Sequence, residues 1–232
     1  MNSLLFQYRL SFICIVLLIS LFMNSCRSTK FLNEDEFLIK EVNIKIDDTA
    51  EKVNKSALKT ELNYFVRQQK NGKILFIPRE YIFYKTSEPG DSSKVNNWIR
   101  SRFGEKPSIH DSLKTIESAK AMEQYLRYKK GFYDATASHE INNGKHKAKI
   151  TYNIVTGKRY KLGSLTYFSK DTTLLRHVVS VAPLSLLTPG EGLDADRFEL
   201  EKARIVNYLQ NQGYADFAAN YISVKGDSTS GN

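Results

Sequence analysis

The sequence lacks the motifs of the common enzyme classes. Its 232 residues contain no HExxH, Walker A, GxGxxG or GxSxG segment. Histidine is scarce, and the four residues fall in different predicted elements: His110, His139, His146 and His177. Acidic residues are scattered over faces predicted to be solvated. We therefore predict that the protein is not an enzyme and has no catalytic residue, no metal site and no cofactor.

Cysteine is almost absent. The chain has two cysteines, Cys14 and Cys26, and Cys14 lies inside the apolar run 10–22. If that run is removed with a leader, Cys26 is the only cysteine left. An intramolecular disulfide is then excluded, and a free thiol in an oxidising compartment would be unusual unless it were modified.

Long hydrophobic runs are also missing. The run 10–22 has 13 residues, fewer than the about 20 that a membrane-spanning helix needs. It is typical of a signal-peptide core. The following Met23-Asn-Ser-Cys26 resembles a bacterial lipobox. We predict a signal peptide at 1–25, a lipidated Cys26 carrying acyl chains such as palmitate, and a polar tether to residue 36. The alternatives are an ordinary signal peptide or an uncleaved anchor.

Arginine-rich runs are absent, although the net charge is +9, from 34 basic and 25 acidic residues. The basic residues are spread along the chain. This distribution favours a solvated mixed surface over a partner-binding patch, and we expect no nucleic-acid partner. Arg27 follows the cysteine, so no aspartate-type signal holds the protein in the inner membrane. The expected location is the outer membrane, lipid-anchored, with the folded part in the periplasm.

Strand and helix patterns alternate from residue 37 to 156. The sequence predicts a strand at 41–47 and a helix at 54–69 that Gly72 ends in a left-handed conformation. An irregular insertion at 72–107 follows, with a short helix at 95–103; its Trp98 is expected in a core or lid, the alternative being a binding anchor. A second helix starts at Asp111 or Ser112 and ends at Gly131. The strands 133–141 and 147–155 form a hairpin whose turn is 142–144.

The region 157–225 repeats part of this order. We predict a strand at 160–168 with a bulge at Gly163, helices at 172–180 and from Asp194 or Asp196 to Gly213, and a strand at 214–224. Residues 226–232 have linker composition. Tyr125–Ala135 and Tyr208–Phe217 are two copies of a helix–glycine–aromatic–strand unit. They indicate a repeated module.

This order resembles tandem POTRA domains, in the lipoprotein version of BamA/TamA-type outer-membrane assembly factors. The resemblance rests on the two helix–glycine–aromatic–strand units and on the segments 26–32, 37–42, 69–75, 104–107 and 157–165. It implies an α+β fold of two β-α-α-β-β modules: module 1 at 37–156 with the insertion 72–107, and an incomplete module 2 at 157–225 that lacks the last strand. Such proteins continue into a membrane β-barrel. We expect no barrel within these residues, and we expect them to be the N-terminal part of a barrel protein.

The resemblance also implies a role in the insertion and assembly of outer-membrane proteins. Its partners would be unfolded outer-membrane proteins, other subunits of the assembly machinery, and the membrane through the lipid anchor. Extended clients would add to an exposed sheet edge by β-augmentation. The expected client-binding edge residues are Tyr133, Ala135, Thr136, Ala137, Ser138, His139, Glu140 and Ile141 in module 1, and Phe217, Ala219 and Tyr221 in module 2. Plain structural edge strands are the alternative.

A different class of function also fits the composition. The protein would then be a free-standing envelope lipoprotein that binds cell-wall glycan or acidic lipid through its basic surface. Binding of that kind should weaken steeply with salt, because exposed charges are screened, whereas main-chain strand addition should not.

Overall fold

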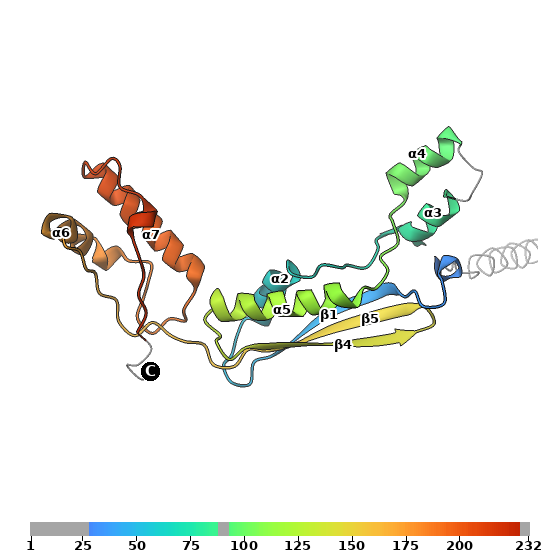
Figure 1. Ribbon diagram of the computed structural model, residues 1–232, viewed down its shortest axis with the longest axis horizontal. Helices are drawn as coiled ribbons and strands as arrows, with labels where there is room; N and C mark the ends of the chain where they lie inside the picture. Colours follow the sequence, from blue (N-terminus) through green and yellow to red (C-terminus); the bar gives the residue numbers. More distant parts are fainter. Residues whose placement is uncertain (1–27, 88–92, 228–232) are drawn as a thin grey trace, which may run out of the picture. The chain divides into compact units, whose positions relative to one another are not determined.

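The computed structural model describes residues 28–87 and 93–227 (Figure 1). Over these residues the fold is mixed α+β, with six α-helices and five strands. The predicted signal peptide, Cys26 and the end of the predicted tail lie outside the described residues. No helix in the described part has both the length and the apolar character needed to cross a membrane. The chain divides into two compact units, each of which is described by itself.

Three strands form the main sheet: β1 (Leu38–Asp47), β4 (Thr136–Gly144) and β5 (Lys147–Val155), in the order β1-β5-β4. The last strand in the sequence is therefore the central one. Its side chains alternate as predicted, with Ala148, Ile150, Tyr152 and Ile154 each at most 1% exposed. This alternation places one face of the sheet in a core.

The second unit contains the helices α2 (Lys55–Asn63) and α5 (Ser112–Tyr128). Figure 1 shows both helices along one face of the part of the sheet that belongs to this unit. The predicted apolar stripes are buried at Leu58 and Leu62 of α2 and at Ala119, Met122 and Leu126 of α5. Met122 fills this core without exposure, as expected of a flexible apolar side chain.

Helix α2 is shorter than predicted, and Gly72 does not end it. The helix ends at Asn63, and Gly72 is absent from the glycines with positive φ. The side chain of Gln68 instead donates to the Ile109 carbonyl at 2.7 Å and accepts from the Asp111 amide at 2.9 Å. These long-range hydrogen bonds hold the segment after α2 in a non-helical conformation. No local sequence pattern predicts them.

The β4–β5 turn lies later than predicted. Lys145 and His146 form it, with φ values of 36° and 59°, and not residues 142–144. The His146 carbonyl accepts from the Leu38 amide at 3.0 Å, and the His146 ring lies 3.2 Å from the Glu36 carbonyl. Contact with the segment leading into β1 therefore positions the turn, against the local preference for Asn-Gly.

The first unit contains the insertion. Its elements are the 3₁₀ helix η1 (Ser28–Phe31), the two-stranded sheet of β2 (Lys73–Ile74) and β3 (Ile77–Pro78), and the helices α3 (Arg79–Lys85) and α4 (Lys94–Phe103). Helix α4 covers the predicted short helix, whereas α3 was not predicted. Trp98 of α4 is 60% exposed, so the expectation of a core residue is wrong.

The second unit also contains α6 (Thr172–Ser180), η2 (Ala182–Leu184), α7 (Ala195–Asn211) and η3 (Ala219–Tyr221). Helices α6 and α7 pack together around Val178, Ile205 and Leu209 (Figure 1). Their caps are Asp171, one residue before the start of α6, and Asp194, one of the two predicted candidates for α7. The predicted helices of this region are therefore confirmed.

The strands predicted at 160–168 and 214–224 do not form. Only an isolated bridge joins Lys161 to Gly192, so the expected bulge at Gly163 has no strand to interrupt. A strand needs a neighbouring strand to bond its main-chain groups. The described part of this region contains no strand that could lie between the two segments and pair with both. Residues 219–221 form the 3₁₀ helix η3 instead.

Candidate functional site

Strand β4 lies at an edge of the three-stranded sheet, because β5 separates it from β1. Its outward side chains alternate as expected: Thr136, Ser138 and Glu140 are exposed, and Ala137, His139 and Ile141 are half-buried between them. Two outward side chains face β5. The Ser138 hydroxyl lies 3.5 Å from the Asn153 carbonyl, and the Asn153 amide donates to Glu140 at 2.9 Å. The predicted edge in module 1 is therefore a strand in this position.

The first two predicted edge residues do not belong to the strand. Tyr133 and Ala135 precede Thr136. Ala135 is fully buried, and its amide donates to the Phe132 carbonyl at 2.9 Å. Tyr133 packs edge-on against Tyr160, with ring centroids 4.8 Å apart. The strand starts at Thr136, and the Ala135 amide is already bonded, so the edge starts later than expected.

Two side chains of α5 cover the beginning of the β4 edge. Arg127 donates from Nε to the Ala135 carbonyl at 2.8 Å, and Glu123 accepts from the Ala137 amide at 3.1 Å. The two side chains are also paired with each other at 3.1 Å. We refer to Glu123 and Arg127 as the clamp. It occupies backbone groups that an added strand would use, which is one way in which proteins protect sheet edges.

The clamp also shows which backbone groups of β4 face outward. The Ala137 amide bonds to Glu123 and so points away from β5. Main-chain groups alternate between the two sides along a strand of an antiparallel pair, so His139, Ile141 and Asn143 also direct theirs outward. The Lys145–His146 turn agrees, because a two-residue loop is closed by a hydrogen-bonded pair of its flanking residues, here Gly144 and Lys147. We call His139, Ile141 and Asn143 the open edge.

The start of the opposite edge is covered by the chain itself. The Ile39 amide donates to the Ser108 carbonyl at 2.9 Å, and the His110 amide donates to the Phe37 carbonyl at 2.8 Å. Leu38 and Ile109 form an antiparallel bridge at the same place. The segment that returns from the insertion thus pairs with the beginning of β1. The β4 edge past the clamp is the better candidate for strand addition.

The predicted edge residues of module 2 are not on a strand. Ala219 and Tyr221 belong to η3, and Phe217 packs against the cluster of Val178, Ile205 and Leu209. The apolar ring of Phe217 contributes more when packed on this core than in an extended segment without a neighbour. The prediction of a client-binding edge in module 2 is therefore wrong, and these three residues do not belong to the candidate site.

A polar cluster ties the segment after α5 to the start of α7. Lys130 Nζ lies 3.0 Å from Asp194 and 3.3 Å from Glu61. Arg159 donates to the Lys130 carbonyl at 2.8 Å and to the Leu193 carbonyl at 2.9 Å. Burial by itself lowers the pKa of the Lys130 ammonium. The hydrogen bond and charge of Asp194 outweigh this and leave that pKa above its usual value. Lys130 therefore stays charged at neutral pH.

Tyr125 extends this cluster. Its hydroxyl donates to Glu61 at 2.8 Å. Burial, followed by this hydrogen bond, raises the pKa of the Tyr125 phenol to about 12. The raised pKa values of Tyr125 and Lys130 move both groups away from neutral pH, where a general acid or base would have to titrate. The cluster is suited to positioning the chain, and the sequence reading missed it because its members are far apart in the sequence.

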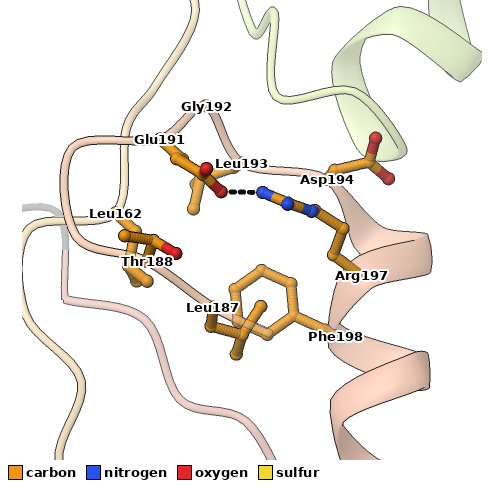
Figure 2. Close-up of a pocket in the computed structure, with 9 residues that line it drawn as sticks. All are labelled: Leu162, Leu187, Thr188, Glu191, Gly192, Leu193, Asp194, Arg197 and Phe198. Atoms are coloured by element: carbon orange, nitrogen blue, oxygen red, sulfur yellow. Dashed lines mark ion pairs between the residues drawn. The ribbon is translucent and has the colours of Figure 1, made fainter. Parts of the chain in front are cut away.

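One pocket lies beside α7. It is lined by Leu162, Leu187, Thr188, Glu191, Gly192, Leu193, Asp194, Arg197 and Phe198 (Figure 2). Its cavity volume of ≈ 10 Å³ accommodates about one water molecule. Figure 2 shows Arg197 and Glu191 joined as an ion pair above it. The pocket is too small to receive a cofactor or substrate.

Metal-binding side chains do not gather in the described part of the chain. No group of three or more histidine, cysteine or carboxylate side chains there is placed to hold an ion. His139 lies on β4, His146 in the turn after it, and His177 near the end of α6. The β4 edge is therefore the feature on which a functional proposal can rest. The sequence matches no protein-family model and no curated protein.

Proposed function

We propose that this chain is a membrane-anchored module of POTRA type that holds extended segments of unfolded outer-membrane proteins, or of partner subunits, during outer-membrane protein assembly. The observation that carries the proposal is the open edge of β4. Its backbone groups at His139, Ile141 and Asn143 point away from β5. The side chains on its solvent-exposed face, Thr136, Ser138 and Glu140, are small or polar. Such an edge binds through main-chain hydrogen bonds and tolerates many client sequences.

The arrangement of the first predicted module supports the POTRA assignment. Apart from the elements of the insertion 72–107, its order is strand, helix, helix, strand, strand, and the last strand lies between the other two. The second predicted module offers less support, because its two predicted strands do not form. We propose that its helices α6 and α7 are positioned by the Lys130 cluster and that it gains its sheet only with a further strand from another segment.

Proline at residue 139 tests strand addition. The His139 amide points away from β5, so His139→Pro removes one client hydrogen bond while it spares the β4–β5 ladder; proline is tolerated at such edge positions. We expect this variant to fold and to lose crosslinking to an outer-membrane protein diluted out of urea. His139→Ala keeps the backbone group and should crosslink like the unchanged chain. Equal crosslinking by the proline variant would overturn the proposal.

Salt dependence separates this function from the basic-surface alternative. Main-chain hydrogen bonds are uncharged, so client capture should change little between low and high salt. Recognition of acidic lipid or glycan by exposed lysines should weaken steeply over the same range. A steep loss of client capture with salt would favour the alternative.

The anchor at Cys26 is a separate part of the proposal. Acylation of Cys26 would hold the N-terminus on the membrane with the strength of more than one acyl chain. Growth with radiolabelled palmitate should label the unchanged chain and leave Cys26→Ser unlabelled. Labelling of the serine variant would place the acyl chains elsewhere.

A further inference from the structure

The insertion exposes large apolar side chains. Leu75 is 87% exposed, Phe76 94%, Val95 65% and Trp98 60%. The first two form the tip between β2 and β3, and the other two lie on α4. We call these four side chains the apolar tip set. Large apolar side chains exposed on one insertion make it a candidate interaction site.

The tip between β2 and β3 carries a conformational cost. Lys73 pairs with Pro78 and Ile74 with Ile77, so Leu75 and Phe76 are the two loop residues. Leu75 has a φ of 55°, in the left-handed region that glycine or asparagine adopts more easily. A strained, exposed leucine contributes nothing to the core. An observed strain of this kind at the surface points to a role outside the folded chain.

Hydrogen bonds hold the tip and α4 on a common base. The Arg79 amide donates to the Gly72 carbonyl at 3.1 Å, which closes the hairpin. Arg79 also donates from Nε to the Phe103 carbonyl at 3.1 Å, and its own carbonyl accepts from the Glu105 amide at 3.2 Å. Trp98 packs edge-on against Phe103, with centroids 5.7 Å apart. Arg79 therefore links the hairpin that carries Leu75 and Phe76 to the end of the helix that carries Val95 and Trp98.

In the described part of the insertion, the exposed charged side chains are basic. Among the described residues 72–87 and 93–107, the side chains of Lys73, Lys85, Lys94, Arg102 and Lys106 are exposed. The acidic side chains there are Glu80 and Glu105, both only half-exposed. Glu105 lies 3.8 Å from Arg79, and Glu80 accepts from Ser28 at 3.1 Å. The sequence of 72–107 also contains Glu88 and Asp91, outside the described residues, and in total it has seven basic and four acidic residues. A basic insertion with exposed apolar side chains is complementary to an anionic lipid surface.

The start of the described chain packs on the same unit. Phe31 of η1 stacks on Tyr84 of α3, with centroids 4.8 Å apart, and contacts Tyr81 at 6.3 Å. Ser28 is two residues after Cys26. With either the predicted lipidated Cys26 or an uncleaved N-terminal anchor, the chain would reach Ser28 from a membrane. A continuous path therefore leads from the predicted anchor to the insertion.

We propose that the insertion 72–107 rests on the bilayer surface, with the apolar tip set in the interface and the surrounding lysines and arginines on anionic headgroups. Tryptophan and other large apolar side chains are suited to this depth of the membrane. The contact gives the first unit a second membrane attachment besides the acylated N-terminus, which fixes its orientation. The inference rests on the anchored N-terminus of the proposed function but not on client binding.

The single tryptophan is the reporter for the test. The full chain, purified from bacterial membranes, is reconstituted into vesicles of phosphatidylethanolamine and phosphatidylglycerol, made with or without brominated acyl chains. We expect Trp98 emission to shift to shorter wavelength and to be strongly quenched by the brominated lipid. Flotation of the vesicles, measured on the same samples, reports the anchor independently.

Two variants locate the contact. Leu75→Ser/Phe76→Ser changes side chains without core contacts, and it should weaken the quenching of Trp98. Phe168→Ser, at an 89% exposed position in the second unit, should leave it unchanged. Trp98→Phe/Phe76→Trp moves the reporter to the tip, where quenching is expected again. Vesicles without phosphatidylglycerol should quench less, since they lack the anionic headgroups.

Each outcome decides the matter. Chains that float with the vesicles but show unquenched Trp98 would overturn the membrane contact, leave strand addition untouched, and assign the apolar tip set to a protein partner. Chains that do not float would overturn the anchor and this inference together. Strong quenching combined with unimpaired crosslinking of His139→Pro would support the membrane contact and refute strand addition.

Discussion

The Nζ of Lys130 lies 3.0 Å from Oδ2 of Asp194, and both side chains are only 15% exposed. The pair joins the residue before Gly131 to the cap of α7. The surrounding backbone follows the same connection: the Tyr160 amide donates to the Gly131 carbonyl at 2.9 Å, and the Leu193 amide donates to the Tyr160 carbonyl at 2.7 Å. Gly131, which follows α5, is therefore the point at which α5, residue 160 and the segment before α7 meet.

Removal of the Lys130 charge should destabilise this junction. Lys130→Met leaves Asp194 largely buried and without its closest cation, so we expect a loss of about 1.5–3 kcal/mol in the free energy of unfolding. Lys129→Met is the matched control. Lys129 lies 3.7 Å from Asp196, but both side chains are more than half exposed, and its loss should cost about 0.5 kcal/mol or less. Urea denaturation measures both, and equal effects would contradict the role of the Lys130 pair.

Alanine substitutions at Gly131 and Gly213 distinguish backbone strain from a steric clash of the added Cβ. Gly131 has a φ of +75° and Gly213 a φ of +96°, so both substitutions meet left-handed strain, worth about 1–2 kcal/mol. Only at Gly131 would a Cβ also meet Leu193 atoms, at 2.9 Å, whereas nothing lies within 4 Å at Gly213. Gly131→Ala should therefore cost a further ~1–3 kcal/mol. The comparison requires both unfolding curves, and a larger loss at Gly213 would contradict it.

Alkaline pH should weaken the Tyr125 contacts. The pKa of this phenol is raised to about 12 in the folded chain, against about 10 in the unfolded chain. A raised pKa stabilises the fold through the neutral phenol. This stability is fully present below about pH 10 and is lost as the pH rises toward 12. Lys130 acts in the same direction, because its pKa is also raised.

The alkaline effect is measured with Tyr125→Phe. This variant lacks the hydroxyl that Glu61 accepts, so it should be less stable than the unchanged chain at pH 8. Its stability should then change less between pH 10 and 12. Urea midpoints across this range give the comparison, and ultraviolet absorbance reports the tyrosinate directly. Parallel curves for the two proteins would show that Tyr125 does not control the loss.

Removal of half of the clamp should lengthen the open edge. Glu123→Ala frees the Ala137 amide, which can then donate to an added strand. One further hydrogen bond of about 1 kcal/mol corresponds to roughly fivefold tighter binding of an unfolded outer-membrane protein. Glu117→Ala is the control, since Glu117 is on the same helix but pairs with Arg67 at 2.9 Å and does not touch β4. Unchanged or weaker binding by Glu123→Ala would contradict the clamp.

Local pattern predicted most of the helices and the hairpin strands. The alternation in β5 and the apolar positions of α2 and α5 were read correctly, because one-sided burial leaves a period of two or of about 3.6 residues in the sequence. The Asp194 cap and the glycines Gly131 and Gly213 that follow α5 and α7 were predicted for the same reason. Each depends on a residue type with a direct effect on its own backbone.

Long-range contacts decided what the pattern missed. Gln68 holds the segment after α2 out of the helix, and Leu38 helps to set the β4–β5 turn by bonding to His146. Tyr160–Phe168 and Tyr214–Val224 have the composition of strands, but a strand exists only where a neighbour accepts its hydrogen bonds. The clamp could not be predicted either, because the spacing of Glu123 and Arg127 does not indicate that they bond to the backbone at the start of β4.

The sequence by itself determined that the chain folds as helices and strands, which faces are apolar, and that its two repeated glycines end helices. Those properties follow from side-chain chemistry and short-range geometry. Only the tertiary structure decided that β4 is an edge, that Glu123 and Arg127 cover its beginning, and that Trp98 and the Leu75–Phe76 tip are exposed. Exposure and hydrogen-bond partners depend on which segments meet in space, and that depends on the packing of the whole fold rather than on any one stretch of it.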